Sequence, residues 1–294
     1  MIALVVNPAA GSGRATHRAS EVARALRAVN EVRVFTTRAR GDEQRCVHDA
    51  VQQGATVLAV VGGDGSVHHT VRGLLAARAT VPLAIFAAGT GNDFVKTLGT
   101  PSHDVAAMTA CVAGGRREAI DVGTIDDVPF VNAAGVGFDV DVLQRMRTAM
   151  LLRGTAAYVW TALRALGGYR GFAGTLSSGS DVPTPLRHRL MTVFANGRCF
   201  GGAFRIAPQA ELRDGCLDVI DIGHVPPIAR PWLFVKAARG RHLQDHGVHV
   251  QRGTAYTLTL EAPPMFEADG ELYRARSSTL EVRVRSAAVT VIMP

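Results

Sequence analysis

The chain has 294 residues, of which 47% are apolar and 19% are charged, and its formal net charge is +7. This length allows about two domains of roughly 150 residues each, and the composition excludes a disordered chain or a small disulfide-stapled scaffold. Nearly all of the positive charge is arginine, with lysine only at Lys96 and Lys236. A basic surface favours nucleotides, nucleic acid or anionic lipid headgroups as partners, although an arginine-rich genome would produce the same bias.

The four cysteines are far apart and form no CxxC pair, so neither a zinc site nor a redox pair is indicated. Free thiols are typical of a reducing cytoplasm. The N-terminus lacks the basic region and the long apolar run of a signal peptide. No stretch reaches the roughly 20 apolar residues of a transmembrane helix. We therefore expect a cytoplasmic protein that would meet a membrane only from its surface.

Strand and helix patterns alternate over the first 125 residues. Apolar runs predict strands over residues 2–6, 32–36, 56–61 and 83–87, and helical spacing predicts helices over 14–29, 42–53, 67–77 and 104–113. Apolar strands separated by helices are typical of a doubly wound parallel sheet. We predict this α/β fold for the first part of the chain.

The pattern changes after about residue 123. Short runs rich in β-branched residues predict strands over 128–136, 190–196, 217–222, 256–261, 280–284 and 289–293, interrupted by helices over 155–166 and 230–239. Residues 174–185 are rich in Gly, Ser and Pro and predict a loop. This part is therefore predicted to be a mostly antiparallel β domain.

Glycine-rich clusters follow three of the predicted parallel strands. They are Asn7-Pro8-Ala9-Ala10-Gly11-Ser12-Gly13, Gly62-Gly63-Asp64-Gly65-Ser66 and Gly89-Thr90-Gly91-Asn92-Asp93, and a fourth, Gly135-Val136-Gly137-Phe138-Asp139, lies in the second part. The carboxyl ends of parallel strands share one sheet edge, so the first three loops should converge. Glycine lets the backbone approach an anion, and a helix N-terminus favours negative charge. Any one cluster could be an ordinary turn, but three together favour a phosphate site.

Familiar phosphate motifs are absent from the chain. It has no G-x-G-x-x-G, since the sixth position is Phe94 after Gly89 and Thr16 after Gly11. It also has no G-x-x-x-x-G-K-[ST] and no Asp-Phe-Gly triplet. These absences argue against a Rossmann domain, a P-loop NTPase and a protein kinase.

The three clusters together resemble the signature of the diacylglycerol kinase catalytic domain family. That superfamily includes bacterial soluble lipid kinases, sphingosine kinases and ceramide kinases, with NAD kinases as distant relatives. The resemblance continues in the second part, at Gly201-Gly202-Ala203-Phe204-Arg205-Ile206-Ala207-Pro208, at Asp214-Gly215-Cys216-Leu217-Asp218 and at Asp269-Gly270-Glu271. It therefore covers nearly the whole chain in order.

The resemblance implies an α/β nucleotide-binding domain over residues 1–123, a β-sandwich over 124–285, and an active site in the cleft between them. In that family the last strand returns to the first domain, which would place residues 286–294 there. The implied cofactors are ATP and Mg²⁺, since phosphoryl transfer needs the phosphates positioned and their charge neutralised.

Residue roles carry over by position in the matched motifs. The nucleotide would be bound by Asn7, Pro8, Gly11, Ser12, Gly13, Thr37, Gly62, Gly63, Asp64, Gly65, Ser66, Gly89, Thr90, Gly91, Asn92 and Asp93. Asp64 and Asp93 would act through Mg²⁺ or its waters, because magnesium prefers oxygen ligands. Glu271 would be the general base for the lipid hydroxyl, with Asp269 beside it and Asp64 as the rival candidate. Taken alone, Asp269-Gly270 would be interpreted as a plain hairpin turn.

Bacterial members of the family also carry a structural Mg²⁺ site in the β domain. The resemblance assigns it to Asp214, with carbonyls from Glu211 and Cys216. A plain Asp-Gly turn before the strand at Leu217 is the open alternative.

Two departures from the family pattern stand out. Ser66 replaces the usual threonine but keeps a hydroxyl for the phosphate. The family's Asn-Glu-x-x-Asn-Gly helix is here His68-His69-Thr70-Val71-Arg72-Gly73, so an acidic side chain is lost and two histidines are gained. This second departure bears on the identity of the substrate and on activity.

Two further features have open interpretations. His242-x-x-x-His246 with His249 lacks the glutamate of a zincin, and we interpret it as a solvated polar stretch. The segment with Met150-Leu151-Leu152, Tyr158, Trp160 and Leu163 could touch a bilayer, but such a stripe more often faces a core, which is our expectation.

The sequence thus predicts an ATP- and Mg²⁺-dependent lipid kinase acting on diacylglycerol or a related lipid at the inner face of the membrane. Basic residues near the surface would each add about 1 kcal/mol to the attraction for anionic lipid. The alternatives are a kinase for a non-lipid acceptor and a nucleotide- or lipid-binding protein with altered catalysis. No nucleic-acid motif is present, and a homodimer is left open.

Overall fold

The computed structural model describes residues 1–148, 155–179 and 187–294. These residues form two units, which we call unit 1 (residues 1–120 and 287–294) and unit 2 (residues 121–286). The chain passes from unit 1 to unit 2 within strand β5 (Arg116–Ile125) and returns within strand β15 (Thr279–Met293).

Unit 1 is built on a parallel sheet with the strand order β2-β1-β3-β4-β15. Its strands are β1 (Ile2–Val6), β2 (Val32–Thr36), β3 (Val57–Gly62), β4 (Leu83–Ala87) and the end of β15, where Val291 pairs with Leu83. Strands β1, β3 and β4 are buried along their whole length. This is expected of central parallel strands covered on both faces, and it explains their continuous apolar runs.

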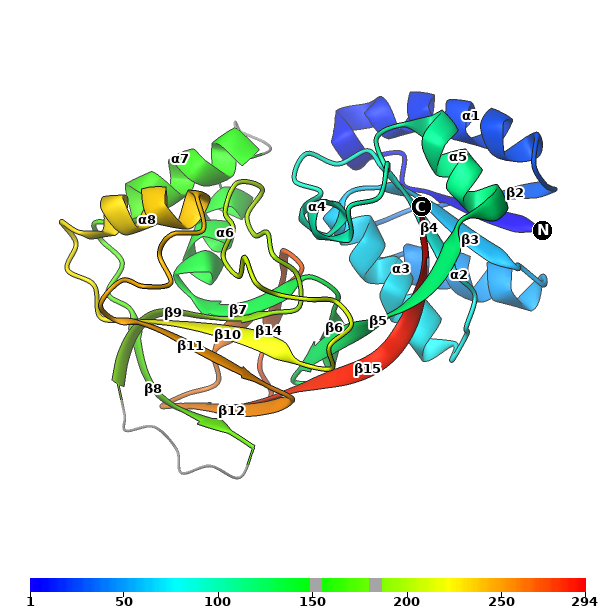
Figure 1. Ribbon diagram of the computed structural model, residues 1–294. Coiled ribbons are helices and arrows are strands. Elements are labelled where there is room, and N and C mark those ends of the chain that lie inside the picture. The colour runs from blue at the N-terminus through cyan, green and yellow to red at the C-terminus, as the bar shows by residue number, and fades with distance from the viewer. Residues whose placement is uncertain (149–154, 180–186) are drawn as a thin grey trace. The chain divides into compact units, whose positions relative to one another are not determined.

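Helices cover both faces of this sheet, with α1 and α5 on one face and α2 and α3 on the other (Figure 1). The helices are α1 (Arg14–Arg27), α2 (Glu43–Gln52), α3 (Asp64–Ala76), α4 (Asp93–Leu98) and α5 (Val105–Gly114), with a 3₁₀ turn η1 (Ala10–Gly13) before α1. Helix α5 begins after Asp104, whose side chain accepts a hydrogen bond from the Ala107 amide at 3.0 Å. The predicted doubly wound α/β domain is confirmed.

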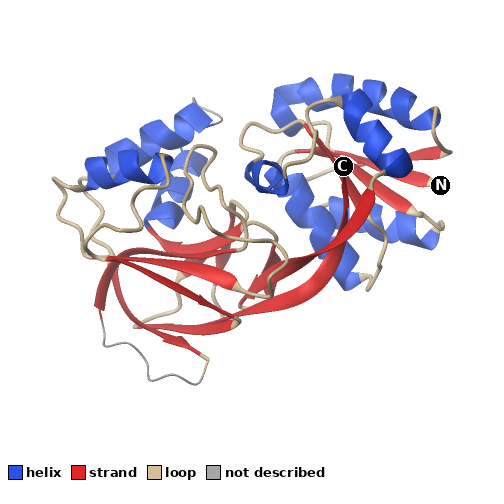
Figure 2. Cartoon of the chain, viewed as in Figure 1, coloured by secondary structure: helices blue, strands red, loops and turns tan. Residues whose placement is uncertain are grey.

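The described residues of unit 2 are mainly in strands, with helices among them (Figure 2). Its further strands are β6 (Val128–Phe130), β7 (Ala133–Gly137), β8 (Phe172–Ser178), β9 (Arg187–Ala195), β10 (Leu217–Gly223), β11 (Val248–Gly253), β12 (Ala255–Leu260), β13 (Met265–Ala268) and β14 (Glu271–Arg274). Its helices in the described residues are α6 (Phe138–Thr148), α7 (Thr155–Ala165) and α8 (Arg230–Ala238). The pairs that β9 forms with β7, β8 and β10 are all antiparallel.

Strand β9 separates two cores in unit 2. Phe194 belongs to the core of the β-sandwich, together with Tyr256 and Phe266. Its neighbours Val193 and Ala195 belong to a second core beneath the helices. This follows from the alternation of side chains along a strand. The predicted β-sandwich therefore carries a helical layer on one of its sheets.

Several elements differ from the sequence-based expectations. The predicted strands over 280–284 and 289–293 are one continuous strand, and the predicted strand over 128–136 is divided into β6 and β7. Residues 172–178 form β8, so the predicted loop over 174–185 is wrong for 174–178, and residues 180–186 lie outside the described part of the chain. No helix among the described residues is both long and apolar enough to cross a membrane.

Candidate functional site

Two of the glycine-rich loops of unit 1 meet at the side chain of Asn7. Its Nδ2 donates hydrogen bonds to Ser66 Oγ at 3.0 Å and to Glu43 Oε1 at 3.1 Å. Its backbone amide donates to the Val61 carbonyl at 3.3 Å, at the end of β3. The loops after β1 and β3 are therefore joined, as their place at the carboxyl ends of neighbouring parallel strands predicts.

The loops after β3 and β4 meet through glycine backbone. A Cβ placed on Gly89 would lie 2.4 Å from Gly63 Cα and 2.8 Å from Asn92 Oδ1. Asn92 itself has a positive φ of 51°, and its Nδ2 donates to the Gly89 carbonyl at 2.9 Å. Because no side chain fits between these loops, the predicted convergence of all three loops is confirmed.

The other predicted nucleotide residues lie on the same loops. Pro8 directly follows Asn7, and the backbones of Gly11, Ser12 and Gly13 form η1 at the start of α1. Gly63, Gly65, Gly89 and Gly91 are half-buried, Gly62 is buried and Thr90 is exposed. Thr37 is buried after β2, and its amide donates to the Val6 carbonyl at 3.0 Å. The predicted set is therefore gathered at one sheet edge.

Glu43 is a residue of this site that the sequence did not single out. Its side chain is only 1% exposed, it accepts the bond from Asn7, and burial raises its pKa. Nothing in the sequence distinguishes it from any acidic residue in the first turn of a helix. Only the packing of α2 shows that Glu43 orients Asn7.

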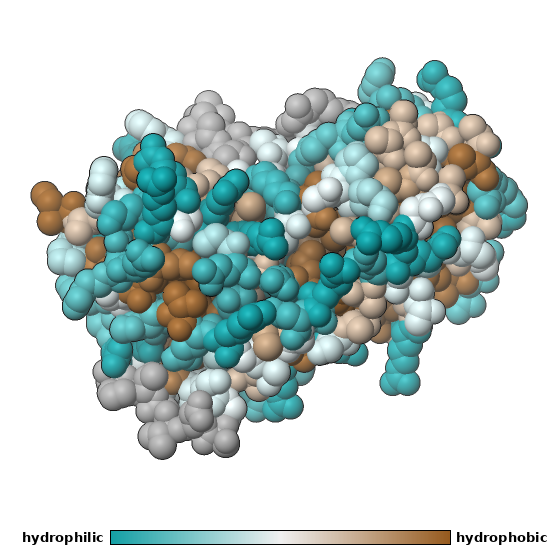
Figure 3. All heavy atoms as spheres, viewed as in Figure 1, coloured by the Kyte–Doolittle hydropathy of each residue, from teal (hydrophilic) through white to brown (hydrophobic). Residues whose placement is uncertain are grey.

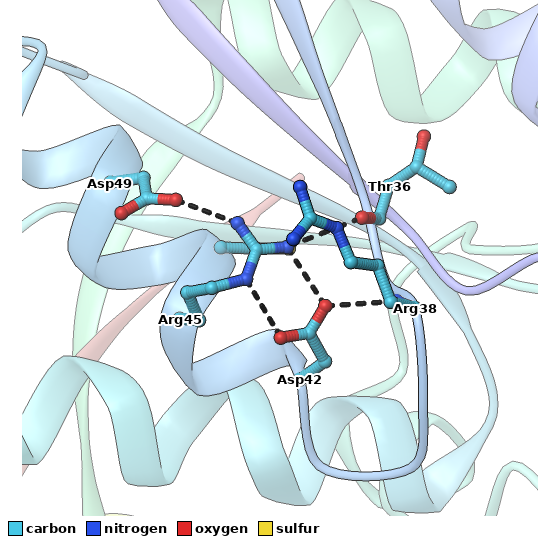
Figure 4. Close-up of polar contacts among 6 residues, drawn as sticks. Thr36, Arg38, Asp42, Arg45 and Asp49 are labelled. Carbon is cyan, nitrogen blue, oxygen red and sulfur yellow. Dashed lines mark hydrogen bonds and ion pairs between the residues drawn. The ribbon is translucent and has the colours of Figure 1, made fainter.

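The first turn of α2 is held by a cluster around Asp42 (Figure 4). The Arg45 guanidinium donates to both oxygens of Asp42 at 2.8 Å and to Asp49 at 2.7 Å. The backbone amide of Arg38 donates to Asp42 at 2.8 Å. The bonds from Arg45 and then from Arg38 lower the pKa of Asp42 to about 2. This cluster holds the helix start from which Glu43 reaches Asn7.

The predicted magnesium residues Asp64 and Asp93 each lie in the first turn of a helix, α3 and α4 respectively. Asp64 Oδ1 accepts a hydrogen bond from the Phe94 amide at 3.4 Å, which ties the two helix starts together. Asp93 pairs with Lys96 at 2.9 Å. Hard carboxylate oxygens beside the glycine-rich loops are of the kind that Mg²⁺ prefers, since it keeps several waters and takes few protein ligands.

The histidines that depart from the family pattern point into the helical layer of unit 1. His68 and His69 are 1% and 8% exposed, and their rings meet edge to face with centroids 5.0 Å apart. A Cβ on Gly41 would lie 3.7 Å from the His69 ring. A Cβ on Gly73 would lie 2.9 Å from Val47 Cβ, so α2 and α3 approach closely there. His69 therefore lies against the loop that precedes α2, and both histidines are buried in unit 1.

In unit 2, Asp269 and Gly270 form the turn of the hairpin β13–β14, both with positive φ. The Asp269 carboxylate accepts hydrogen bonds from the amides of Val131, Asn132 and Ala133 at 3.0, 2.9 and 3.3 Å. These bonds join the hairpin to the start of β7. The turn that was the alternative interpretation of Asp269-Gly270 is therefore present in the structure, and the Asp269 carboxylate anchors this turn.

Glu271, the predicted general base, begins β14 directly after this turn. Its Oε2 lies 3.8 Å from the Arg147 guanidinium of α6, and its side chain is 12% exposed. The anchored turn therefore sets the position of Glu271.

Two further carboxyl groups are buried beside this hairpin, and both side chains are 0% exposed. Glu267 Oε2 accepts from the Gly270 amide at 2.7 Å, while Glu267 Oε1 has no hydrogen-bond partner. The Asp139 carboxyl meets the amides of Asp139 and Val140 at the start of its own helix, and no cation among the described residues pairs with it. A Cβ on Gly135 would lie 1.8 Å from Asp139 Oδ2 and 3.3 Å from Glu267 Oε1, so both carboxyls face this glycine. Burial raises the pKa of Asp139 to about 7 and that of Glu267 well above its usual range. Asp139 closes the fourth glycine cluster, which was a signal for it in the sequence.

The predicted structural metal site of unit 2 has a different arrangement. Asp214 accepts from the Cys216 amide at 2.9 Å and forms an ion pair with the Arg252 guanidinium. Glu211 is exposed. Arg252 is thus the partner of Asp214 in this structure, and the structural Mg²⁺ site at Asp214 stays a prediction. Among the described residues no group of three His, Cys, Asp or Glu side chains could hold a metal ion.

The histidines at 242, 246 and 249 do not form a cluster that could bind a metal ion. His242 is fully buried, which lowers its pKa, whereas His249 contacts Arg187 at 3.2 Å on the exposed face of β11. The expectation of a solvated stretch is therefore wrong for His242.

Comparison with known proteins agrees with this geometry. Residues 1–125 match the model of the diacylglycerol kinase catalytic domain, and residues 132–293 match that of the YegS C-terminal NAD kinase beta sandwich-like domain. A diacylglycerol kinase of Mycobacterium tuberculosis (strain ATCC 25618 / H37Rv) is 29% identical over 303 residues, covering 100% of this chain and 95% of that protein. A probable YegS-like lipid kinase of Pseudomonas aeruginosa (strain UCBPP-PA14) is 32% identical, covering 67% of this chain and 65% of that protein.

Solved structures show the same fold at low identity. A putative diacylglycerol kinase from Bacillus anthracis str. Sterne has a TM-score of 0.80 at 20% identity, covering 100% of this chain and 97% of that chain. An NAD kinase from Archaeoglobus fulgidus, solved in complex with ATP, has a TM-score of 0.54 at 13% identity, covering 99% and 93%. With both domain models matched in order, the chain belongs to the family of diacylglycerol kinases and YegS-like lipid kinases.

Proposed function

We propose that this kinase-family chain transfers the γ-phosphoryl group of ATP to the hydroxyl of a membrane lipid, diacylglycerol or a close relative. The observation that carries the proposal is the convergence of three glycine-rich loops on Asn7, Gly63 and Gly89. Backbone amides without side chains between them can approach phosphate oxygens closely, and the starts of α1, α3 and α4 favour negative charge.

The side chains around these loops position the phosphates. Glu43 and Ser66 take both hydrogens of the Asn7 amide, which fixes the orientation of its Oδ1. Asp64 and Asp93 would hold Mg²⁺ directly or through its waters. When bound, that ion would neutralise charge on the transferred phosphoryl group.

Glu271 is the proposed general base. As the acceptor oxygen forms its bond to the γ-phosphorus, the bond to the β–γ bridging oxygen breaks, ADP leaves, and the hydroxyl proton passes to the Glu271 carboxylate. Both oxygens of Asp269 accept backbone hydrogen bonds, so Asp269 holds the turn and does not take the proton. Asp64 is the rival base.

Two alternatives are kept because of the His68-His69 departure. The first is a kinase for a non-lipid acceptor, and the second is a binding protein with altered catalysis. The burial of both histidines, with the His69 ring beside Gly41, favours retained activity, because the hydrogen bonds of Asn7 with Ser66 and Glu43 remain. We place the active protein in the cytoplasm, acting on the inner face of the membrane.

The test is transfer of label from γ-labelled ATP with Mg²⁺ to vesicles containing diacylglycerol, monoacylglycerol, ceramide, sphingosine or phosphatidylglycerol. We expect label in one lipid, and at least a 100-fold loss for Glu271→Gln and for Asp64→Asn. Glu281→Gln is the matched control, since Glu281 is an exposed carboxylate of the same unit that pairs with Arg283.

Each other outcome separates the alternatives. ATP binding with no labelled lipid, but with label in a soluble alcohol, supports the non-lipid kinase. ATP binding without transfer to any acceptor supports the binding protein. Absence of ATP binding overturns the phosphate-site proposal itself.

A further inference from the structure

Both tryptophans of the chain are exposed, and they lie on two helices of unit 2. Trp160 on α7 is 53% exposed and Trp232 on α8 is 65% exposed. Leu163, Ile228 and Val235 are exposed beside them in sequence, so these segments carry five of the eight exposed large apolar side chains among the described residues. We call Trp160, Leu163, Ile228, Trp232 and Val235 the tryptophan face. In Figure 3 some hydrophobic residues, drawn in brown, are exposed in the region of α7 and α8.

Helices α7 and α8 are held together by specific contacts, so the tryptophan face has a fixed arrangement. The buried Arg230 guanidinium at the start of α8 donates to the carbonyls of Leu166 and Tyr169, after α7, at 2.5 and 2.7 Å. Beneath them, the Phe204 ring lies 6.3 Å from that of Tyr158 and 4.3 Å from that of Phe234.

The inward faces of both helices are already filled. Ala162, Ala165 and Leu166 of the α7 segment and Leu233 and Ala237 of α8 are buried in the core beneath the helices. Trp160 and Leu163 are therefore not part of this core. The expectation that the apolar stripe of this segment faces a core is wrong for these two residues. Tyr158 packs against that core, and residues 150–152 lie outside the described part of the chain.

The charge on the α7 and α8 segments is mainly positive, and Lys236 of α8 pairs with the carboxylate of Asp245. Residues 158–170 and 224–244 contain no Asp or Glu, and Arg164, Arg170, Arg239 and Arg241 are exposed there. The Arg164 guanidinium lies 5.8 Å from the centre of the Trp160 ring. On α8, Trp232, Val235 and Arg239 share one side of the helix by their spacing of three and four residues. Aromatic side chains flanked by arginine are typical of surfaces that bind anionic bilayers.

A second occupant, another copy of this chain, is disfavoured by that charge, because two such faces would bring arginines together. A lipid chain inside the protein is also disfavoured. The apolar cavity beneath the helices, lined by Tyr158, Phe204 and Phe234 among others, measures about 50 Å³. A cavity of about 150 Å³ is needed to hold one benzene.

We propose that the tryptophan face docks unit 2 on the surface of an anionic lipid bilayer, with the indole rings at the headgroup level and the arginines on lipid phosphates. The proposal adds a membrane-binding surface to the proposed function. It rests on that function, since a lipid kinase must reach an acceptor that lies in the membrane. Docking itself needs neither ATP nor transfer.

The test uses the two tryptophans as reporters, without ATP. Trp160→Phe leaves Trp232 as the single tryptophan, and Trp232→Phe leaves Trp160. With vesicles of phosphatidylglycerol and phosphatidylcholine, we expect the emission of each to shift to shorter wavelength, and the shift to disappear with pure phosphatidylcholine or at high salt. Unchanged emission from both reporters overturns the proposal.

Co-sedimentation with the same vesicles gives the energetic test. The double variant Trp160→Ala/Trp232→Ala should lower vesicle binding at least tenfold, while Val250→Ala, an exposed apolar control on β11 of the same unit, should leave it unchanged. Circular dichroism and ATP binding equal to those of the unmodified chain would show that the variant is folded. Equal vesicle binding by the folded double variant, or a dimer in solution that the double variant dissociates, contradicts the proposal.

The kinase assay separates failure of docking from failure of the proposed function. The double variant should lose activity on vesicle-bound lipid and retain it on the same lipid dispersed in detergent. If the chain binds vesicles but transfers no phosphoryl group, the docking proposal holds and the proposed kinase function is contradicted.

Discussion

Asp42 of unit 1 and Asp139 of unit 2 both lie at the start of a helix, yet their pKa values move in opposite directions. Asp42 accepts bonds from Arg45 and from the Arg38 amide, and its pKa falls to about 2. Asp139 is fully buried beside Glu267, and burial raises its pKa to about 7 although the amides of Asp139 and Val140 lie against it. Burial without a charged donor, and not position on a helix, therefore raises the pKa of a carboxyl here.

The same contrast runs within the hairpin β13–β14. Asp269 accepts three backbone hydrogen bonds, while Glu267, two residues earlier, faces Asp139 with one oxygen lacking a partner. Unit 2 thus holds one carboxylate that ties strands together and a carboxyl pair whose burial favours protonation. The four predictions below test this contrast and the loop contacts of unit 1.

The largest effect is expected from Asp269→Ala. Three buried amides would lose their acceptor, each at about 1–2 kcal/mol, so the free energy of unfolding of unit 2 should fall by about 3–6 kcal/mol. Urea denaturation measures it. Asp127→Ala is the control, because Asp127 also has a positive φ but is exposed and pairs only with Arg276 on the surface. A loss below about 1 kcal/mol for Asp269→Ala would contradict the anchoring role.

Asp139→Asn should stabilise the protein in a pH-dependent way. The raised pKa of Asp139 means that its stabilising contribution is complete below about pH 4 and is lost as pH rises through about 7. Asparagine does not titrate, so the advantage of the variant should grow from pH 4 to 7 and level off above, on the order of 3 kcal/mol at pH 8.

Thermal and urea unfolding at pH 5 and pH 8 would measure this difference. Asp141→Asn, two residues further along α6, is the control, since Asp141 is partly exposed and paired with Arg145. A variant that is no more stable than the unmodified chain at pH 8 would show that Asp139 is charged at no cost.

Gly89→Ala should weaken ATP binding at least tenfold. The added Cβ would meet Gly63 Cα at 2.4 Å, and backbone cannot yield as a flexible side chain does. Isothermal titration calorimetry with Mg-ATP measures the affinity. Gly114→Ala, where nothing lies within 4 Å of the new Cβ, should bind ATP normally. Unchanged affinity for Gly89→Ala would place the nucleotide elsewhere.

The smallest effect is expected from Glu43→Ala, which removes an acceptor of the Asn7 amide. We expect about 1 kcal/mol of lost stability and a two- to fivefold weaker affinity for ATP, with Glu43→Gln restoring most of both because it keeps the acceptor oxygen. Glu21→Ala on the exposed side of α1 is the control. If Glu43→Gln is as damaging as Glu43→Ala, the charge of Glu43 and not its hydrogen bond matters.

The central strands β1, β3 and β4 of unit 1 were predictable because buried parallel strands are apolar throughout, whereas β2 is a partly exposed edge strand. β1, β2 and β4 have the bounds expected from the sequence. In unit 2, β8, β11, β13 and β14 were not predicted, because they are short or half-exposed and lack a strong apolar pattern. The short helix α4 was also not predicted. It begins after Asn92, whose positive φ the sequence does not reveal.

The glycine clusters and the Asp-Gly-Glu motif were visible in the sequence because glycine and acidic residues at fixed spacing follow directly from backbone chemistry. Tertiary structure decided which groups those residues meet. It placed Glu43 on Asn7, Arg252 on Asp214, and Asp139 beside Glu267, and it left Trp160 and Trp232 on the outer side of their helices. Charge state and exposure depend on neighbours that are distant in the chain, so local pattern determined the elements and the motifs, while packing determined the protonation and the surfaces.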